Sequence, residues 1–448
     1  MLPLANVFLD FNLPNATTWF YLSLILAVGL FFKFNRFFSI RNWDVLSLYL
    51  LVPGFLFLQE AERLRRGGSN SETAQSIRLY GYIWLMSGSF CFFLRSLLDL
   101  TLVRRPALWP NLNLAGLACI AGALYVCMLP VAARRPAELQ MPSGKSTAAM
   151  NLIGEAGSQT VGQMQTLAGD EARRGAVTRF WVERSLAMAC HLAIAVALVL
   201  IGGIHFHSTT SGMAAATFYL LLPYTAYELG QAHHVVPTAL LLWAIFCYRK
   251  PMLSGILLGV AVGCFFFPAL TLPIWLSFYR RRGAGRFLLF FGIAASLSLG
   301  LTGLVLWWDG ALAKSMQLVL SNPNWQPWQR TGESIWGSIH WAYRLPVFVL
   351  YLAFVILTSI WPSPKNLAHV ISLSAAVLIG IQFWYADHGG VYVLWYLPLL
   401  VLMIFRPNLS DRFPPTPKPP PTWPFRATRA LFGGIMRQIE PRQPASKV

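Results

Sequence analysis

The residues of this chain best suited to chemistry are a few carboxylates at the edges of strongly apolar segments. Asp44 lies at the start of one apolar run, and Asp99 closes the next, one turn after Arg95. Ionisable groups near lipid are costly, so each is a candidate for function. Asp44 and Asp99 are therefore our candidate catalytic residues. The alternative for each is an interfacial charge paired with a nearby arginine.

Two polar turns could bind a phosphate or a sugar. Gln231, His233 and His234 form a turn before an apolar run, and Asp387 and His388 lie in a second turn that ends in two glycines. No carboxylate or cysteine at a metal-ligand spacing accompanies the histidines. We therefore expect phosphate contacts or helix capping at these turns, and neither a metal ion nor a cofactor.

The last candidates are cations and aromatic residues in connecting loops. Arg104 and Arg105 form a basic pair shortly after Asp99. Trp325, Trp328 and Arg330 lie together in a loop among asparagines and glutamines. Flat aromatic faces beside amide donors suit a sugar ring, and they suit ordinary loop packing equally well.

The composition indicates that helices in a membrane position these residues. Of the 448 residues, 56% are hydrophobic and only 12% are charged, whereas soluble domains carry about 25% charged residues. A membrane span needs roughly 20 apolar residues, and many runs approach that length. We predict an all-α integral membrane protein with about 11–13 transmembrane or re-entrant helices. The predicted spans are residues 18–34, 44–58, 79–103, 112–132, 185–205, 234–248, 252–278 as a broken hairpin, 286–307, 345–361, 367–385 and 390–405, while segment 213–229 either crosses or only dips into the membrane.

Residues 252–278 are the most informative of these segments, because prolines break their helix. Pro268 and Pro273 free backbone groups for which lipid offers no partner. Such breaks persist where protein or a watery cavity covers them, so the pair indicates a packed site. Gly255 and Gly259 lie four residues apart on one helix face and predict close packing against another helix.

The positions of lysine and arginine set the predicted topology. The formal net charge is +18, and the basic residues lie mostly between apolar runs. This pattern is typical of cytoplasmic loops and of contact with anionic membrane lipids, and it argues against nucleic-acid binding. We predict a multi-pass protein of a bacterial-type inner (plasma) membrane. Its N-terminus, the loops 59–78 and 133–184 and the turn at Arg249 are then cytoplasmic, and the histidine pairs at His205 and His233 lie outside.

Four regions follow from these patterns. They are N-terminal membrane helices (1–132), a polar cytoplasmic loop (133–184), C-terminal membrane helices (185–410) with an outer loop (308–344), and a Pro-rich basic cytoplasmic tail (411–448).

The order of the motifs resembles the polytopic C-type (GT-C) glycosyltransferases, in particular the polyprenyl-phosphate-mannose-dependent family 87. The shared features are a Gly-Gln turn, a Leu-rich helix, a basic-Pro turn, a glycine-containing helix entry, a Pro-broken return helix and an aromatic motif before the last span. In this sequence they are Gly230-Gln231, Leu240-Leu241-Leu242, Arg249-Lys250-Pro251, Leu253 to Gly259, Pro268 with Pro273, and Val391 to Pro398.

The resemblance implies transfer of a mannose-like sugar from a polyprenyl-phosphate donor to a lipid or glycan acceptor on the outer membrane face. In that scheme Asp44 or Asp99 is the base, while the histidines, the arginine pair and Arg330 stabilise the phosphate leaving group. Two alternatives stay open. One is a small-solute transporter, because broken helices also form transport sites. The other is a noncatalytic membrane scaffold of the same fold, favoured by the phenylalanines that stand where the family often carries a lysine before the proline of the return helix.

Overall fold

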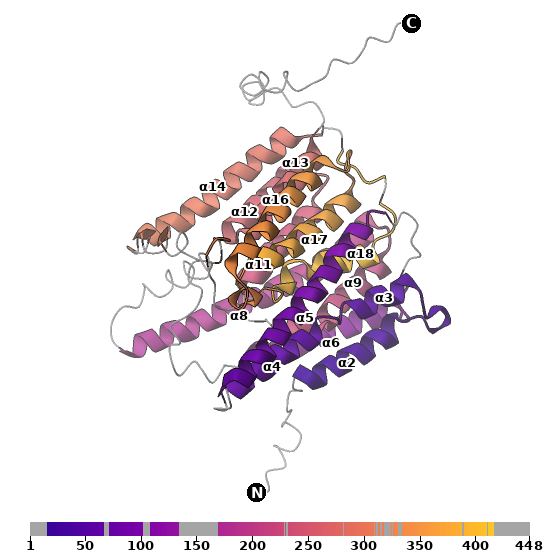
Figure 1. Cartoon of the computed structure of the whole chain (residues 1–448). Helices are drawn as coiled ribbons and strands as arrows, with labels where there is room; N and C mark the ends of the chain where they lie inside the picture. Colours follow the sequence, from indigo (N-terminus) through magenta and orange to yellow (C-terminus); the bar gives the residue numbers. More distant parts are fainter. Residues whose placement is uncertain are drawn as a thin grey trace, which may run out of the picture. The chain divides into compact units, whose positions relative to one another are not determined.

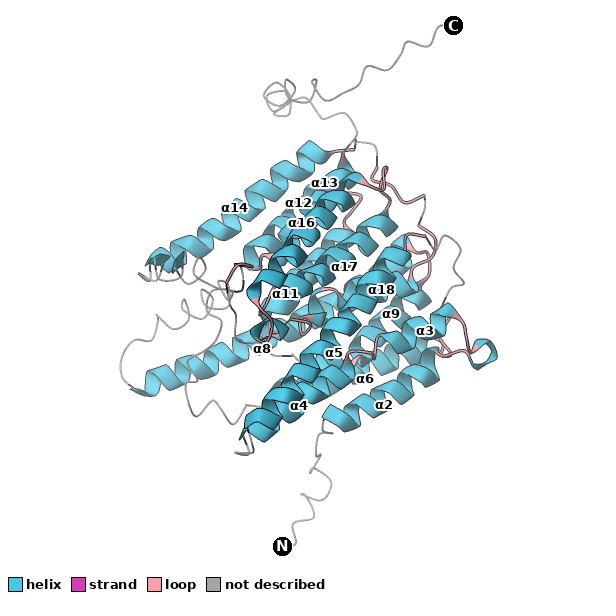
Figure 2. Cartoon of the chain, viewed as in Figure 1, coloured by secondary structure: helices cyan, strands magenta, loops and turns pink. Residues whose placement is uncertain are grey.

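A computed structural model of the chain describes residues 16–66, 71–101, 108–133 and 169–415, apart from residues 228, 230, 231, 281, 309, 311, 314, 315, 318–323, 325, 330–333, 388 and 410. Every regular element within these ranges is a helix, as Figure 2 shows, and none is a strand. The predicted all-α fold is therefore confirmed for the described residues. Most of the predicted polar loop and of the tail lies outside them.

The helices succeed one another along the chain as shown in Figure 1. In chain order they are α2 (Ala16–Phe31), α3 (Ile40–Ser47), α4 (Val52–Arg66), α5 (Ser71–Leu98), α6 (Leu114–Ala133), α8 (Gly169–Leu200), α9 (Thr209–Leu221), α10 (Pro223–Tyr227), α11 (Ala232–Phe246), α12 (Pro251–Cys264), α13 (Leu272–Tyr279), α14 (Ala284–Trp308), α16 (Arg344–Ile360), α17 (Leu367–Trp384) and α18 (Leu397–Phe405), with shorter turns that include η4 (Phe267–Thr271) and η7 (Val393–Trp395).

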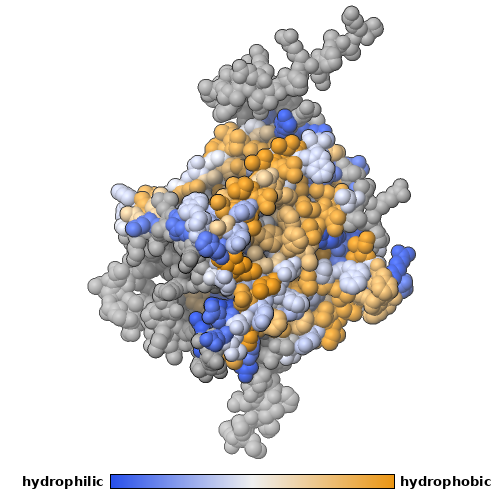
Figure 3. Space-filling view, in the orientation of Figure 1, coloured by the Kyte–Doolittle hydropathy of each residue, from blue (hydrophilic) through white to orange (hydrophobic). Residues whose placement is uncertain are grey.

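Seven segments of the described chain are long and apolar enough to cross a membrane. They are the α3–α4 pair, α5, α6, α8, α14, α16 and α17. Four shorter apolar helices lie in α2, α11, α12 and across η4 and α13. Figure 3 shows apolar side chains over much of the visible face of the helices, with hydrophilic residues gathered near helix ends. A multi-pass membrane protein is the consequence, and several predicted spans are short helices instead of full crossings.

Many helix ends meet at one end of the bundle, which we call the Arg406 end. There, Arg406 after α18 contacts Asp99 after α5. Nε2 of His205, at the end of the π-helical turn η3 (Ile201–His205) that continues α8, lies 2.7 Å from the carbonyl oxygen of Phe246 at the end of α11. The Tyr279 hydroxyl, at the end of α13, donates over 2.6 Å to a carbonyl in the turn that follows α11. The opposite ends of the long helices, which we call the far end, lie away from these contacts.

Three helix pairs enter the bundle from the Arg406 end and return to it. They are α9 with α11, α12 with α13, and α17 with α18, each pair consecutive along the chain apart from short turns. In the last pair the two helices pack on each other, whereas α9 packs mainly on α6, α8 and α18, and α11 packs mainly on α8 and α12. At about 1.5 Å per residue, α11 and α12 are roughly 21–22 Å long, whereas α5, α8 and α14 are roughly 37–48 Å long. The turns at which the pairs reverse, in residues 222–231, 265–271 and 385–396, therefore lie within the depth of the bundle. We call these three turns the hairpin tips.

The first hairpin corrects the predicted topology. Residues 234–248 are predicted to cross the membrane, but α11 begins at a hairpin tip and ends beside the end of α8. His205 thus lies at the Arg406 end and His233 at a tip, so the predicted common side for the two pairs is wrong. The chain therefore makes one crossing fewer than predicted. Loop 59–78 lies at the far end and Arg249 at the Arg406 end, whereas the prediction placed both on the cytoplasmic side. Length is the reason, because α9 and α11 each fall short of the roughly 20 residues of a span, and together they enter and leave the bundle at the same end.

The glycines of α12 allow its close packing against α14. A Cβ atom at Gly255 would lie 2.5 Å from the backbone oxygen of Phe287, and one at Gly259 would lie 2.5 Å from that of Phe291. Only a residue without a side chain fits at these distances. The predicted role of the glycines in helix packing is confirmed, and the predicted break after α12 is confirmed as the second hairpin tip.

Candidate functional site

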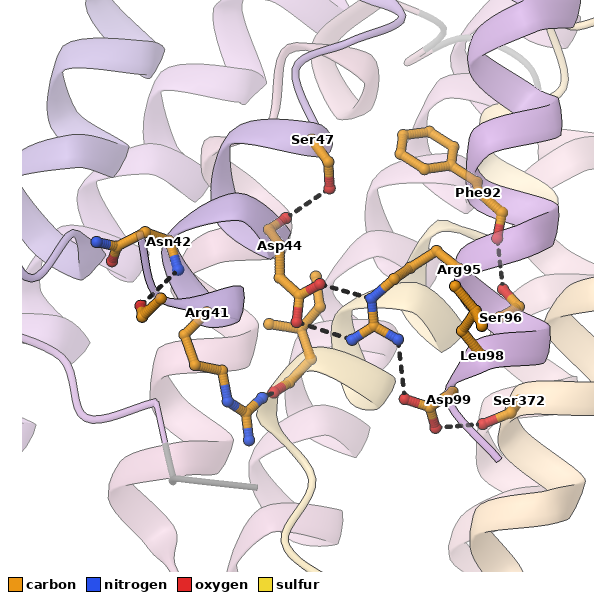
Figure 4. A network of polar contacts seen from close by, with 12 residues as sticks. Arg41, Asn42, Asp44, Ser47, Phe92, Arg95, Ser96, Leu98, Asp99 and Ser372 are labelled. Carbon is orange, nitrogen blue, oxygen red and sulfur yellow. Dashed lines mark hydrogen bonds and ion pairs between the residues drawn. The ribbon is translucent and has the colours of Figure 1, made fainter. Parts of the chain in front are cut away.

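Both predicted base residues lie in a buried ion-pair network at the Arg406 end (Figure 4). Arg95 donates from Nε and Nη2 to the two oxygens of Asp44 over 2.6 and 2.8 Å, and from Nη1 to Oδ1 of Asp99 over 3.2 Å. Arg406 donates to Oδ2 of Asp99 from Nη2 over 2.5 Å and from Nε over 3.0 Å. The Ser372 hydroxyl donates to the same oxygen over 2.6 Å. Two carboxylates thus face the guanidinium groups of Arg95 and Arg406.

This network is buried and joins parts of the chain that are distant in sequence. Asp44 and Asp99 are only 4% and 1% exposed. Their partners join α3, α5, α17 and the end of α18, and Arg41 of α3 also donates to the carbonyl oxygen of Ile404 in α18. Each of the four carboxylate oxygens already accepts a hydrogen bond, which leaves little access for a substrate hydroxyl. The geometry supports a structural role, and catalysis by Asp44 or Asp99 stays a prediction.

A second polar cluster, at the hairpin tips, contains three of the predicted substrate-binding residues. The indole N–H of Trp395 donates to Nδ1 of His234 over 2.8 Å, and the His233 ring lies with its centroid 4.0 Å from that of His234. The Tyr392 hydroxyl donates to Oδ2 of Asp387 over 2.8 Å. The Tyr392 ring also stacks on Trp395, with centroids 4.4 Å apart. Two aromatic residues therefore hold His233, His234 and Asp387 in one cluster.

The third hairpin tip is shaped by Gln382, a residue that our sequence reasoning missed. Its Oε1 accepts from the backbone N–H groups of Gly390 over 2.8 Å and Tyr392 over 3.4 Å, and its Nε2 donates to the Tyr392 carbonyl over 3.3 Å. Gly390 has a φ of +88°, a conformation that a glycine adopts without strain. A Cβ atom there would lie 2.7 Å from that of Leu85, so the tip rests directly on α5. A single buried amide within an apolar helix would have been the signal.

Arg344, also missed from the sequence, ties the outer loop to the same tip. Its side chain is fully buried. It donates to the Trp384 carbonyl over 2.7 Å, to the Gln326 carbonyl over 3.2 Å and to that of Asn324. Trp328 lies in this anchored segment and is 56% exposed. One buried cation therefore places an exposed indole face next to the third hairpin.

A buried lysine closes the turn between α16 and α17. Nζ of Lys365 donates to the Ser277 hydroxyl over 2.9 Å and to the carbonyls of Ser359 over 3.1 Å and Pro362 over 2.9 Å. Only 2% of the residue is exposed, and burial lowers the pKa of its ammonium group from 10.5 to about 8. This contact fixes α13 against the α16–α17 turn at the Arg406 end.

The structure divides the predicted site residues into two groups. His233, His234 and Asp387 meet at the hairpin tips, with the Trp328 segment anchored nearby, whereas Asp44 and Asp99 lie at the Arg406 end. Between the contact at Trp395 and that at Arg406 runs α18, whose nine residues span roughly 13 Å. A single site that joins both groups, as the sequence predicted, is not formed. Arg104, Arg105, Gln231, Trp325, Arg330 and His388 lie outside the described residues.

Fold and site together define an all-helical, multi-pass membrane protein with a polar cluster at the tips of three returning helix pairs. Within the described residues, no three histidine, cysteine or acidic side chains are grouped so that they could hold a metal ion. Comparisons with protein-family models, with curated proteins and with solved structures find no match for this chain.

Proposed function

We propose that this protein is a membrane glycosyltransferase whose reacting groups lie at the hairpin tips. It would move a mannose-like sugar from a polyprenyl-phosphate donor to a lipid or glycan acceptor. The observation that carries the proposal is the meeting of one carboxylate, Asp387, with two imidazoles, His233 and His234, where three helix pairs reverse. Sugar transfer from a phosphate carrier needs a base and a set of donors for the leaving phosphate.

In this scheme Asp387 replaces Asp44 and Asp99 as the base. The acceptor hydroxyl gives its proton to Asp387 while its oxygen forms a bond to the anomeric carbon of the sugar. The bond between that carbon and the phosphate oxygen breaks, and polyprenyl phosphate leaves with the electron pair. The hydrogen bond from Tyr392 to Oδ2 holds the carboxylate in place, and fixed orientation of the base favours the reaction.

The two histidines are suited to the leaving phosphate. Because Trp395 donates its only N–H to Nδ1 of His234, a neutral His234 carries its proton on Nε2, which is then a hydrogen-bond donor. His233 lies beside it, in the first turn of α11. The free N–H groups and partial positive charge of a helix N-terminus also favour an anion.

Trp328 is the aromatic residue best placed for the sugar ring. Trp395 is fully buried between Tyr392 on one side and Phe267 on the other, with centroids 4.4 and 4.5 Å away. Its faces are therefore occupied and its role is to support the tip. Trp328 keeps an exposed face in the segment that Arg344 anchors, and an exposed indole can stack on a sugar.

The test is transfer by the purified protein in lipid, with radiolabelled polyprenyl-phosphate sugars and a glycolipid extract as acceptor. We expect labelled product from the wild type and a loss of about 100-fold or more in Asp387→Asn, the range of a removed acid–base group. Asp411→Asn is the matched control, since Asp411 is an exposed carboxylate at the Arg406 end. Folded wild type that yields no product with any donor would contradict the proposal.

A second candidate function is transport of a small solute. Helices that break within a membrane also form transport sites at mid-depth, and the three returning pairs favour this reading. A transporter would move labelled solute into sealed vesicles without forming a new glycosidic bond. If the protein transports solute but transfers no sugar, and Asp387→Asn abolishes the transport, the protein is a transporter.

A further inference from the structure

Residues 32–43, which are the connection between α2 and α3 together with the first turn of α3, expose large apolar side chains at the Arg406 end. We call this segment the aromatic loop. The exposed fractions of Phe34, Phe37, Phe38, Ile40 and Trp43 are 70%, 57%, 82%, 57% and 58%. In Figure 3 the loop projects at the right of the view, where apolar and strongly hydrophilic residues lie side by side. Neither the ion-pair network nor the hairpin tips account for this surface.

The backbone of the aromatic loop is held by one buried amide. Asn42 is 1% exposed. Its Oδ1 accepts from the N–H of Lys33 over 3.0 Å. Its Nδ2 lies 3.0 Å from the carbonyl oxygens of Lys33 and Arg36 and 3.2 Å from that of Phe37. The loop is therefore built to present its rings outward, and their exposure is not the result of a loose backbone.

The aromatic loop also carries positive charge. Arg36 is exposed beside the rings, and Nζ of Lys33 donates to Oδ1 of Asn111 over 2.5 Å. No acidic residue occurs in residues 32–43, and the next one, Asp44, is engaged by Arg95. Exposed rings next to cations fit the boundary of a bilayer, where apolar groups reach acyl chains and cations reach phosphate groups.

The position of the loop agrees with that boundary. It begins where the apolar helix α2 ends, and Asn111 joins it to the segment before α6, a candidate membrane span. That neighbouring segment exposes Trp109 by 57%. We propose that the aromatic loop is a binding site for anionic phospholipid, with Arg36 and Lys33 on the headgroup phosphate and the phenylalanine rings among the acyl chains.

Native mass spectrometry of the full chain tests the proposal. The protein in nonionic detergent is incubated with equal amounts of phosphatidylglycerol and phosphatidylcholine, and the lipid retained on it is counted. We expect the wild type to retain phosphatidylglycerol preferentially. Arg36→Gln should reduce that retention about fivefold, the effect of one basic residue near an anionic surface. The double variant Phe37→Ser, Phe38→Ser should lower retention of both lipids.

Arg63→Gln is the matched control, because Arg63 is an exposed arginine on α4 at the far end, with 81% of its side chain accessible. Its retention should equal that of the wild type. Equal retention in wild type, Arg36→Gln and the double phenylalanine variant would overturn the proposal. So would a doubled protein mass that the phenylalanine substitutions abolish, which would assign the loop to a contact between copies of the chain. The melting temperature of each variant shows whether a loss of lipid retention reflects unfolding. Arg36 has an exposed side chain, so its replacement should leave the core intact.

Discussion

Replacing Asp99 by asparagine should cost more stability than any other change in the ion-pair network. Asp99 accepts from Arg95, Ser372 and twice from Arg406, and its side chain is fully buried. The amide of Asp99→Asn has no charge and presents an N–H₂ group to the guanidinium groups. It leaves Arg406, whose side chain is 5% exposed, as a buried cation without its carboxylate. Removing one partner of a buried ion pair costs about 3–5 kcal/mol.

Asp44 provides an internal comparison for this prediction. After Asp44→Asn, Arg95 keeps its bond to Asp99 and has a side chain that is 19% exposed, so the loss should be smaller, about 1–3 kcal/mol. The surface pair of Arg63 with Glu60 has side chains that are 81% and 47% exposed. Arg63→Gln should therefore change stability by less than about 1 kcal/mol.

The assay is equilibrium unfolding in mixed micelles with a rising fraction of sodium dodecyl sulfate. A double-mutant cycle adds Arg406→Met, alone and with Asp99→Asn. Because the double variant leaves neither charge unpaired, its loss should be smaller than the sum of the single losses, with an interaction free energy of about 1–3 kcal/mol. A loss of stability below about 1 kcal/mol for Asp99→Asn, or strictly additive losses in the cycle, would refute a stabilising buried ion pair between Asp99 and Arg406.

Three further predictions concern packing, pH and the outer loop. Gly259→Leu should force α12 away from α14 and lower the free energy of unfolding by about 1–3 kcal/mol. Gly292→Ala, with open space around the new Cβ, should be neutral or slightly stabilising. Equal losses of stability in the two variants would contradict the close approach of α12 to α14. The pKa of Lys365 is about 8 in the fold against 10.5 unfolded, so the unfolded state binds the proton more tightly and stability should rise with pH between these values, by about 1.4 kcal/mol per unit of pKa difference. Unfolding midpoints from pH 7 to 10 should show this rise in the wild type and not in Lys365→Met, and parallel curves would exclude it. Arg344→Met should release residues 324–329 from the third hairpin and speed their proteolysis at least severalfold, while cleavage at an unchanged rate would show that other contacts hold the segment.

The helical fold could be predicted from the sequence because lipid leaves the backbone few choices. Long apolar runs such as those of α6 and α14 became spans close to their predicted limits. The returning pairs were harder to recognise, because α11 is as apolar as a spanning helix and only its length separates the two. The contact of His205 with Phe246 reveals its path, and it joins residues that are distant in sequence. An error at one such turn reverses the topology of every preceding helix.

The candidate site could be predicted only where polar residues interrupt apolar sequence. The turns at His233 and Asp387 are such interruptions, and the fold brings them together. The same rule also selected Asp44 and Asp99, because sequence alone does not show that Arg95 and Arg406 lie against them. Gln382 and Arg344 were missed because each makes its contacts with backbone carbonyls and N–H groups, and the sequence does not show which backbone groups lie beside a side chain.

Photocrosslinking can show whether a polyprenyl-phosphate sugar binds at the hairpin tips, as we propose. A donor analogue with a photoreactive group on the sugar is irradiated with the protein in lipid, and the labelled peptides are mapped. We expect label in residues 324–329 or 385–396. Unlabelled donor should compete with this labelling, and Trp328→Ala should reduce it. Label concentrated around Asp44 and Asp99 would contradict binding at the hairpin tips. So would labelling that unlabelled donor does not reduce at any position.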